Sequence, residues 1–309
     1  PRPVRADISD EAVTLARLSL DALVDASEVF PSIIRADLHA CIFQIFVTIM
    51  GTAACQATLI PQALPIFRRF ISGVGADPGE DTKKQIRSTL SRFLMILKNA
   101  QKREFEASLP CEKNTILAGT MLITSANAAF EASDPLLLRF VTELTECLDN
   151  PMTTKMAAGC VRTLLVVPIR GAAHPAILSR LLPRLVTFLT TPSELEGVEQ
   201  SRTIIAQSLT TSLSSLPTTK KLAGFALLIP TLLTRAERET SENVQKETAA
   251  RLMELAGNDA GAFRGVVLRL SAEQKALMER IIKGSQGPKQ EVREEVEEKE
   301  PTIALKMNF

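Results

Sequence analysis

Apolar residues recur along almost the whole chain with the period of an amphipathic helix, about 3.6 residues. Leu137, Val141 and Leu144 lie on one such helical face, while Arg139 and Glu143 take the opposite face. No long segment alternates with the period of two that marks a β-strand. The pattern therefore predicts an all-α protein.

Residues that cap helices mark the ends of the predicted elements. Asp134-Pro135 and Asn150-Pro151 each combine a side-chain acceptor with a proline, whose missing N–H costs nothing at the first helical position. Capping boxes begin at Thr191 and Ser271. These signals predict helices at residues 9–29, 33–50, 61–74, 82–100, 112–130, 135–149, 151–167, 174–190, 192–215, 218–236, 241–256, 259–269 and 271–284.

The predicted helices repeat in pairs. Pro65, Pro183 and Pro230 each follow apolar residues within a helix, and each of these helices precedes a second amphipathic helix. Second helices recur at about 44–46 residues in the C-terminal half, a period typical of HEAT or armadillo units. The longer interval from Pro65 to Pro183 is expected to hold an extra hairpin. We predict an α-solenoid of about six HEAT/armadillo-type hairpins over residues 1–284, with the proline-bearing first helices on its convex side.

The C-terminal end differs from the repeats. Residues 285–300 contain six glutamates and are predicted to be an acidic linker. Residues 301–309 alternate with period two, which is typical of an extended peptide that offers one apolar face to a groove or sheet edge; a frayed terminus is the alternative. The candidate protein-binding residues of this segment are Ile303, Leu305, Met307 and Phe309.

Length and composition favour an elongated array over one compact core. The chain has 309 residues, more than a single core usually holds, and only 4% of them are aromatic. The net charge of +1 gives no electrostatic reason to expect nucleic-acid binding. Residues 40–67 carry no charge, but Gly51 and Pro61 divide them, so we expect two buried helices; a membrane span is the alternative.

No arrangement of residues points to catalysis, a cofactor or a metal. The two histidines, His39 and His174, are far apart, and the sequence has no glycine-rich phosphate loop and no Cys-x-x-Cys pair. An Asp37–His39 acid–base pair is disfavoured because adjacent-but-one residues of a helix diverge. The five cysteines are predicted to be mostly buried free thiols in a reducing compartment. A nucleophilic cysteine is the enzyme alternative, with Cys111 as the least buried by pattern.

A basic cluster extends over residues 83–103. Lys84, Arg87 and Lys98 can share one flank of the predicted helix and are candidate protein-binding residues. An acidic peptide of a partner, or the acidic tail of this chain, could bind there. An ordinary solvated helix face is the alternative. The acidic residues Glu194, Glu196 and Glu199 are expected to lie on polar surfaces with near-normal pKa values.

Four short strings lie among the otherwise generic repeats. They are RADLHACIF at 35–43, CQA at 55–57, PQALPIFRRF at 61–70 and PTIALKMNF at 301–309. In these strings the chain resembles the C-terminal region of the HEAT-repeat-containing protein 5 family. Because the chain begins at Pro1 without an initiator methionine, we expect it to be the C-terminal piece of a longer protein.

The resemblance implies a role in membrane traffic. Members of that family are very large cytosolic solenoids that assist clathrin adaptor protein complex 1 at the trans-Golgi network and endosomes, together with accessory proteins of the aftiphilin type. We therefore expect a non-enzymatic, cytoplasmic scaffold that reaches membranes only through these partners, and a homo-oligomer is an open alternative. A scaffold of another process, such as nuclear transport or phosphatase assembly, is the alternative function.

Overall fold

The computed structural model describes residues 8–30, 32–76, 78–102, 108–167, 173–192 and 197–285. In this part of the chain every regular element is a helix, which confirms the all-α prediction. The α-helices are α1 (Asp10–Val29), α2 (Ser32–Gly51), α3 (Leu59–Val74), α4 (Glu80–Gln101), α5 (Ser108–Ser125), α6 (Pro135–Glu146), α7 (Thr154–Val166), α8 (Ala173–Thr190), α9 (Val198–Ser214), α10 (Thr218–Arg238), α11 (Glu242–Asn258), α12 (Ala260–Val267) and α13 (Ala272–Ser285). Two 3-10 helices, η1 (Ala53–Cys55) and η2 (Asn127–Ala129), lie between them.

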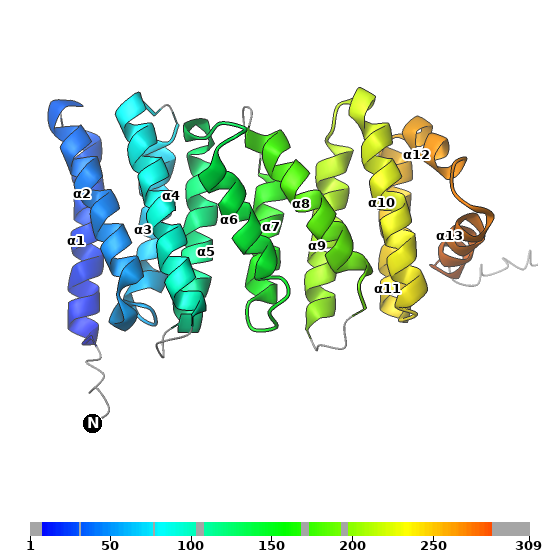
Figure 1. Ribbon diagram of the computed structural model, residues 1–309, viewed down its shortest axis with the longest axis horizontal. Helices are drawn as coiled ribbons and strands as arrows, with labels where there is room; N and C mark the ends of the chain where they lie inside the picture. Colours follow the sequence, from blue (N-terminus) through cyan, green and yellow to red (C-terminus); the bar gives the residue numbers. More distant parts are fainter. Residues whose placement is uncertain are drawn as a thin grey trace, which may run out of the picture.

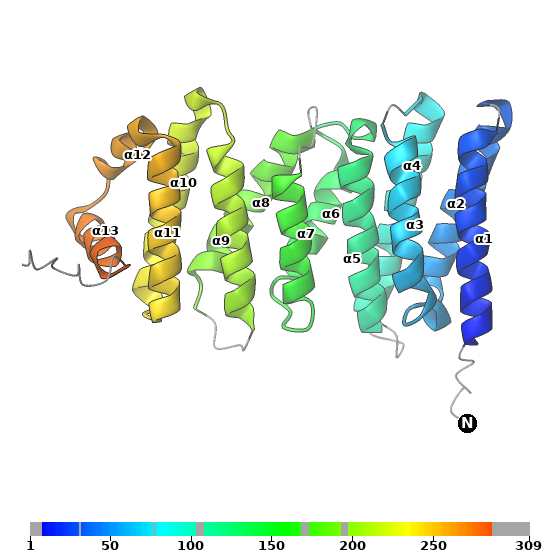
Figure 2. The same ribbon diagram turned by 180° about the vertical axis from the view of Figure 1, so that it is seen from behind.

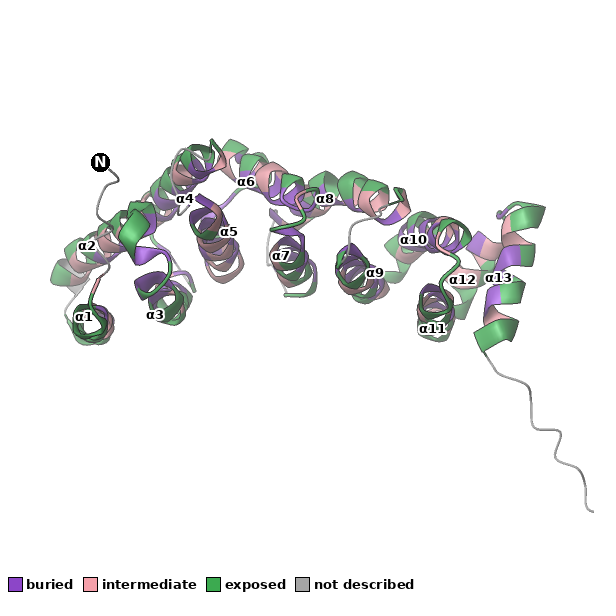
Figure 3. Cartoon of the chain, turned by 90° about the horizontal axis from the view of Figure 1, so that it is seen from below, coloured by how far each residue is buried: buried purple, intermediate pink, exposed green. Residues whose placement is uncertain are grey.

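The helices form two layers, which Figures 1 and 2 show from opposite sides. The odd-numbered helices α1 to α11 lie side by side in one layer, and the even-numbered helices α2 to α10 form the other. Within each layer every helix contacts the next, while α12 continues from α10 and α13 from α11. Figure 3 shows that both layers curve, with the even-numbered helices on the convex side and the odd-numbered helices on the concave side. The predicted α-solenoid is therefore confirmed.

The repeat length agrees with the sequence pattern. Successive odd-numbered helices begin 44 to 49 residues apart, at Asp10, Leu59, Ser108, Thr154, Val198 and Glu242. The predicted equivalence of the three proline-bearing helices is wrong, however. Pro183 and Pro230 lie in α8 and α10 of the convex layer, whereas Pro65 lies in α3 of the concave layer. A proline within a helix removes one backbone hydrogen bond in either layer, so its position does not report which layer the helix joins.

Two predicted caps have the expected geometry. The side chain of Asp134 accepts a hydrogen bond from the Leu136 amide at 3.0 Å and opens α6. Ser271 Oγ accepts from the Gln274 amide at 3.1 Å, and Gln274 Oε1 accepts from the Ser271 amide at 3.2 Å. This reciprocal pair is a capping box, and it satisfies two amides that the first turn of α13 leaves without helical partners.

Two predicted helix starts are several residues too early. The Asn150 carbonyl accepts from the amides of Thr153 and Thr154, which builds a turn before α7 begins at Thr154. The helix predicted from residue 192 begins at Val198, after Gly197 with a φ of 83°. That left-handed conformation suits glycine, which has no Cβ to clash with the backbone. The capping box predicted at Thr191 extends into residues 193–196, outside the described part of the chain.

Phenylalanine rings join the first helices across both layers. The ring centroids of Phe46 and Phe67 are 4.7 Å apart, and those of Phe67 and Phe93 are 6.0 Å apart, which links α2, α3 and α4. All three side chains are buried. Full burial of each such ring contributes about 1.5–3 kcal/mol. The few aromatic residues of the chain therefore anchor the N-terminal hairpins.

The uncharged stretch at residues 40–67 is divided as predicted, by η1 between α2 and α3. Ile34–Gly51 within α2 is long and apolar enough to cross a membrane by length and composition alone. Its Ile42, Phe43 and Phe46 are buried in the core, whereas Ile34 is exposed.

Gly119 allows α5 and α6 to approach closely. A Cβ at this position would lie 2.2 Å from the nearest ring carbon of Phe140, which is itself fully buried. By contrast, nothing lies within 4 Å of a Cβ built at Gly159 in the middle of α7. Close packing against Phe140 therefore requires a glycine at position 119, whereas packing does not require one at position 159.

Gly119→Ala should lower the free energy of unfolding by about 1–3 kcal/mol, because the added methyl group overpacks the Phe140 ring. Gly159→Ala is the matched control and should raise the free energy of unfolding by about 0.5–1 kcal/mol, because alanine has the higher helix propensity. Urea unfolding followed by circular dichroism measures both. Shifts of the same sign at the two positions would contradict the close-approach interpretation.

Candidate protein-binding surfaces and a buried charge network

The basic candidates on α4 lie on the convex layer and differ in their contacts. Arg87 Nε lies 2.8 Å from Oδ2 of the buried Asp134, so this side chain joins α4 to the first turn of α6. Lys84 pairs with Asp81 at 3.2 Å within the same helix, and both side chains are largely exposed. Lys98 is exposed. Arg87 is thus engaged in the fold, and Lys84 and Lys98 stay candidates for a partner.

The predicted terminal segment lies outside the described residues. Its candidate binding residues Ile303, Leu305, Met307 and Phe309, and the acidic linker beyond Ser285, stay predictions from the sequence.

A groove of about 570 Å³ crosses the concave layer between α3, α5 and α7. Leu117 and Met121 of α5 and Met156 of α7 give it an apolar, half-buried lining. Arg68 of α3 and Lys155 of α7 are exposed at its opposite walls. Hydroxyl groups of α5 and α7 also line it, at Thr120, Thr124 and Thr163. An apolar floor with methionines and hydroxyl acceptors is typical of surfaces that bind peptides.

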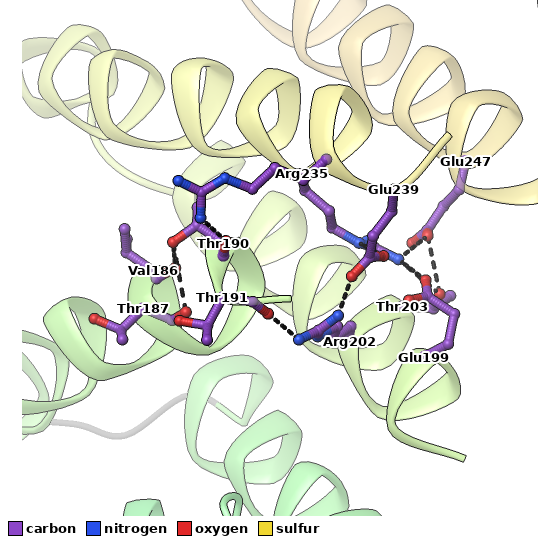
Figure 4. Close-up of polar contacts among 11 residues, drawn as sticks. Val186, Thr187, Thr190, Thr191, Glu199, Arg202, Thr203, Arg235, Glu239 and Glu247 are labelled. Carbon is purple, nitrogen blue, oxygen red and sulfur yellow. Dashed lines mark hydrogen bonds and ion pairs between the residues drawn. The ribbon is translucent and has the colours of Figure 1, made fainter. Parts of the chain in front are cut away.

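Arg235 is the centre of a second feature, a buried charge network between α9, α10 and α11. Its side chain is 1% exposed, and its Nη2 contacts Glu199 and lies 3.0 Å from Oε2 of Glu247. Thr203 Oγ1 lies 3.3 Å from the same nitrogen and donates to Glu247 Oε2 at 2.9 Å. Figure 4 shows that these side chains converge from three helices.

Arg202 and Arg238 extend the network to the end of α8. Arg202 forms an ion pair with Glu239 and donates to the carbonyl of Thr191. Its guanidinium lies 5.7 Å from the ring centroid of Phe188, a cation–π contact. Arg238 donates to the carbonyl of Thr190. The carbonyls at the end of α8, which have no helical partners, are thereby satisfied by side chains of the next repeats.

Two neighbouring glutamates of the network, Glu199 and Glu239, have pKa values shifted in opposite directions. Burial, a hydrogen bond with Glu199 and the charge of Glu199 raise the pKa of Glu239 to about 7, against the opposing charges of Arg202 and Arg235. Partial burial opposes ionisation of Glu199, but the hydrogen bond with Glu239 and the charges of Arg235 and Arg202 lower its pKa. The carboxyl of Glu239 therefore changes its protonation state near neutral pH, because its pKa is about 7.

Few features of the sequence indicate this network. Glu199 is exposed at the surface, as expected, but its pKa is lowered and not near normal, because Arg235, 36 residues away, and Arg202 lie close to it. Glu194 and Glu196 lie outside the described residues. A signal does exist in the arginines Arg202 and Arg235 within otherwise apolar stripes, since a buried arginine requires a carboxylate partner.

Cys111, the candidate nucleophile, lies in an environment that disfavours the reactive thiolate. Cys111 is 2% exposed, and burial raises its thiol pKa, whereas Cys41 is the exposed cysteine of the described chain. The prediction that Cys111 is the least buried is therefore wrong, because α5 lies between α3, α4 and α7. All five cysteines are free thiols.

His39 has a packing role in the described structure. Its ring meets Phe70 edge-on at 5.4 Å, and burial and the charge of Arg35 lower its pKa. Among the described residues no group of three His, Cys, Asp or Glu side chains could hold a metal ion.

Arg235→Met should lower the free energy of unfolding by about 3–5 kcal/mol, because it removes the fully buried cation from the partly buried carboxylates of Glu239 and Glu247. Arg184→Met is the matched control. Arg184 pairs with Asp149 at 2.7 Å in an exposed position, so its loss should cost less than about 1 kcal/mol. Guanidinium unfolding at neutral pH measures both values, and equal losses would show that the network contributes no more than a surface pair.

Glu239→Gln should flatten the pH dependence of stability. The folded carboxyl keeps its proton up to about pH 7, whereas the unfolded one releases it near 4.5. The folded state therefore binds more protons between these values, and the stability of the unsubstituted protein falls as pH rises through this window. Glutamine resembles the protonated acid and does not titrate. Melting temperatures across the window measure the difference, with Glu242→Gln on an exposed turn as the control that should retain the fall.

Comparison with known proteins identifies the family. The family described as LAA1-like, C-terminal TPR repeats matches residues 133–295. Tetratricopeptide repeats, like HEAT and armadillo units, are helical hairpins that stack into solenoids. No curated protein and no solved structure gives a significant match.

The matched residues are separate from the strings at 35–43, 55–57, 61–70 and 301–309 that carry the resemblance. Two independent parts of the chain thus lead to the same family. Because the match covers more than half of the chain, this protein belongs to the LAA1-like family, the HEAT-repeat-containing protein 5 family, and carries its C-terminal helical repeats.

Proposed function

We propose that the chain is a non-enzymatic protein-binding scaffold in vesicle traffic that depends on clathrin adaptor protein complex 1. Membership of the LAA1-like family is the observation that carries the proposal. Its partners would be that adaptor complex and accessory proteins of the aftiphilin type. The protein would act in the cytoplasm at the trans-Golgi network and endosomes and reach their membranes through these partners.

The shape of the molecule supports a binding role. A solenoid exposes long helical ridges on both of its faces, so extended or helical segments of partners have large surfaces to follow. The convex face offers the exposed Lys84 and Lys98, and the concave face offers the groove between α3, α5 and α7. These two surfaces differ in curvature and in lining, which suits them to different partner segments.

Affinity capture of the tagged native protein tests the proposal directly. We expect the adaptor complex and an aftiphilin-type accessory protein to be recovered together. Lys84→Glu with Lys98→Glu should lower the recovery of at least one of them severalfold, because these lysines are the candidate contacts on α4. Lys220→Glu with Lys283→Glu, two exposed lysines near the other end of the solenoid, is the matched control. Failure to recover any adaptor-associated protein would refute the assignment.

Crosslinking mass spectrometry on the same native complex locates the partners. Lysines that a crosslinker can modify lie on both faces. Lys84 and Lys98 belong to the convex layer, and Lys113 and Lys155 belong to the concave layer. Partner crosslinks confined to one pair of lysines would assign the accessory protein to that face. Absence of partner crosslinks to any lysine between 80 and 283 would contradict a binding role for these repeats.

A further inference from the structure

The middle of the concave layer is basic, unlike its two ends. The helices that form the groove carry Arg68, Arg69, Lys113, Lys155 and Arg162, and their one acidic residue, Glu112, is buried. Arg69 is paired with Asp21 and Asp25 of α1. Within the described chain no ion pair engages Arg68, Lys155 or Arg162.

Acidic residues predominate in the helices at either end of the same layer. Five of the six charged residues of α1 are acidic, and α11 has three glutamates against one lysine and one arginine. The glutamates of α11 are paired with Lys246, Arg235 and Arg251, so this helix leaves no unpaired cation for a negatively charged peptide, whereas the middle of the concave face does. The groove lies at that basic middle.

The chain itself contains a peptide of matching chemistry. Residues 291–300 hold six glutamates against Arg293 and Lys299, and the following nine residues alternate apolar and other side chains. An extended strand places alternate side chains on one face. Ile303, Leu305, Met307 and Phe309 would then face the apolar floor formed by Leu117, Met121 and Met156. The last glutamates, Glu297, Glu298 and Glu300, would lie near Arg68, Lys155 and Arg162.

The connecting chain is long enough to reach the groove. Four helix-to-helix contacts lead from α13 through α11, α9 and α7 to α5. At roughly 8–10 Å each, these steps amount to about 40 Å. The twelve residues from Ser285 to Glu297 span up to about 40 Å when extended, and the eighteen residues to Ile303 span up to about 60 Å. Occupation of the groove by the tail of the same molecule is therefore sterically feasible.

We propose that residues 297–309 bind in the groove between α3, α5 and α7 of their own chain and cover it against acidic peptides of other proteins. Both the charge and the apolar alternation of this segment complement the groove. The proposal stands apart from the adaptor role, since it concerns an intramolecular contact.

Photocrosslinking of the full chain tests the proposal. Phe309 is replaced by p-benzoyl-phenylalanine, a photoreactive residue of similar shape that inserts preferentially into methionine side chains. Irradiation should join residue 309 to Met121 or Met156, the two methionines of the groove. The adduct should have the mass of one chain, and its yield should fall as salt is raised, because salt screens the charge attraction.

Two kinds of variant separate groove binding from chance contact. Arg68→Glu with Lys155→Glu and Arg162→Glu should lower the crosslink yield at least about fivefold, because each exposed charge pair contributes a factor of about two to five. Lys84→Glu with Lys98→Glu on the convex face should leave it unchanged. Gly159→Leu places a side chain into open space at the groove and should also lower the yield, whereas Gly257→Leu, at an equally open position on α11, should not.

Three results would overturn the proposal. The first is a dominant adduct outside residues 68–72, 113–125 and 155–167, which line the groove. The second is a yield that the groove and control variants lower equally. The third is an adduct with the mass of two chains, which would assign the tail to the groove of a second copy. None of these results bears on recovery of the adaptor complex, so the adaptor role and the tail contact are tested separately.

Discussion

Burial of each helix's apolar stripe by its neighbours is the constraint on which the architecture depends. A single hairpin leaves half of that stripe exposed, and only the next hairpin covers it. The consequence is visible in α6, where Leu137, Val141 and Leu144 are fully buried although the helix is only 12 residues long. The core is continuous from α1 to α13 and lies between the two layers. Side chains on the outer faces of the layers therefore need not be apolar and can bind partners.

Apolar contact alone does not determine how one hairpin is oriented on the next, because it has no direction. The network around Arg235 supplies direction in the C-terminal half. Its hydrogen bonds connect α9, α10 and α11, and Arg202 and Arg238 extend them to the end of α8. Such groups contribute less to net stability than apolar side chains of equal volume, but they penalise every packing that leaves a charge unpaired. We interpret the network as a device that sets the register of these repeats.

The features predicted correctly from the sequence depend on residues close together in the chain. The features that were missed depend on the layer in which a helix lies. Helix existence, the caps at Asp134 and Ser271 and the repeat length follow from residues close together in the chain. The layer of Pro65, the burial of Cys111 and the environment of Glu199 depend on neighbours about 35 to 60 residues away. Periodicity gives the buried face of a helix but not which helix covers it. For the same reason, Arg87 was expected to be free on a basic flank although Asp134 holds it.

The charge of the concave layer differs from helix to helix, which the net charge of the whole chain does not reveal. The net charge of +1 conceals an acidic α1, a basic middle at α3, α5 and α7, and an acidic α11. Salt screens electrostatic interactions beyond the Debye length, about 8–10 Å at physiological salt. A bound peptide is therefore affected mainly by the charges of the nearest helices, and a local excess of positive charge decides where an acidic peptide binds. The two cations of α11, Lys246 and Arg251, are already paired with its glutamates, so this helix offers an acidic tail no unpaired cation close to its attachment point. Unpaired cations at the middle of the layer and paired ones at its near end give an acidic segment a physical reason to bind four helix-to-helix contacts away from α13.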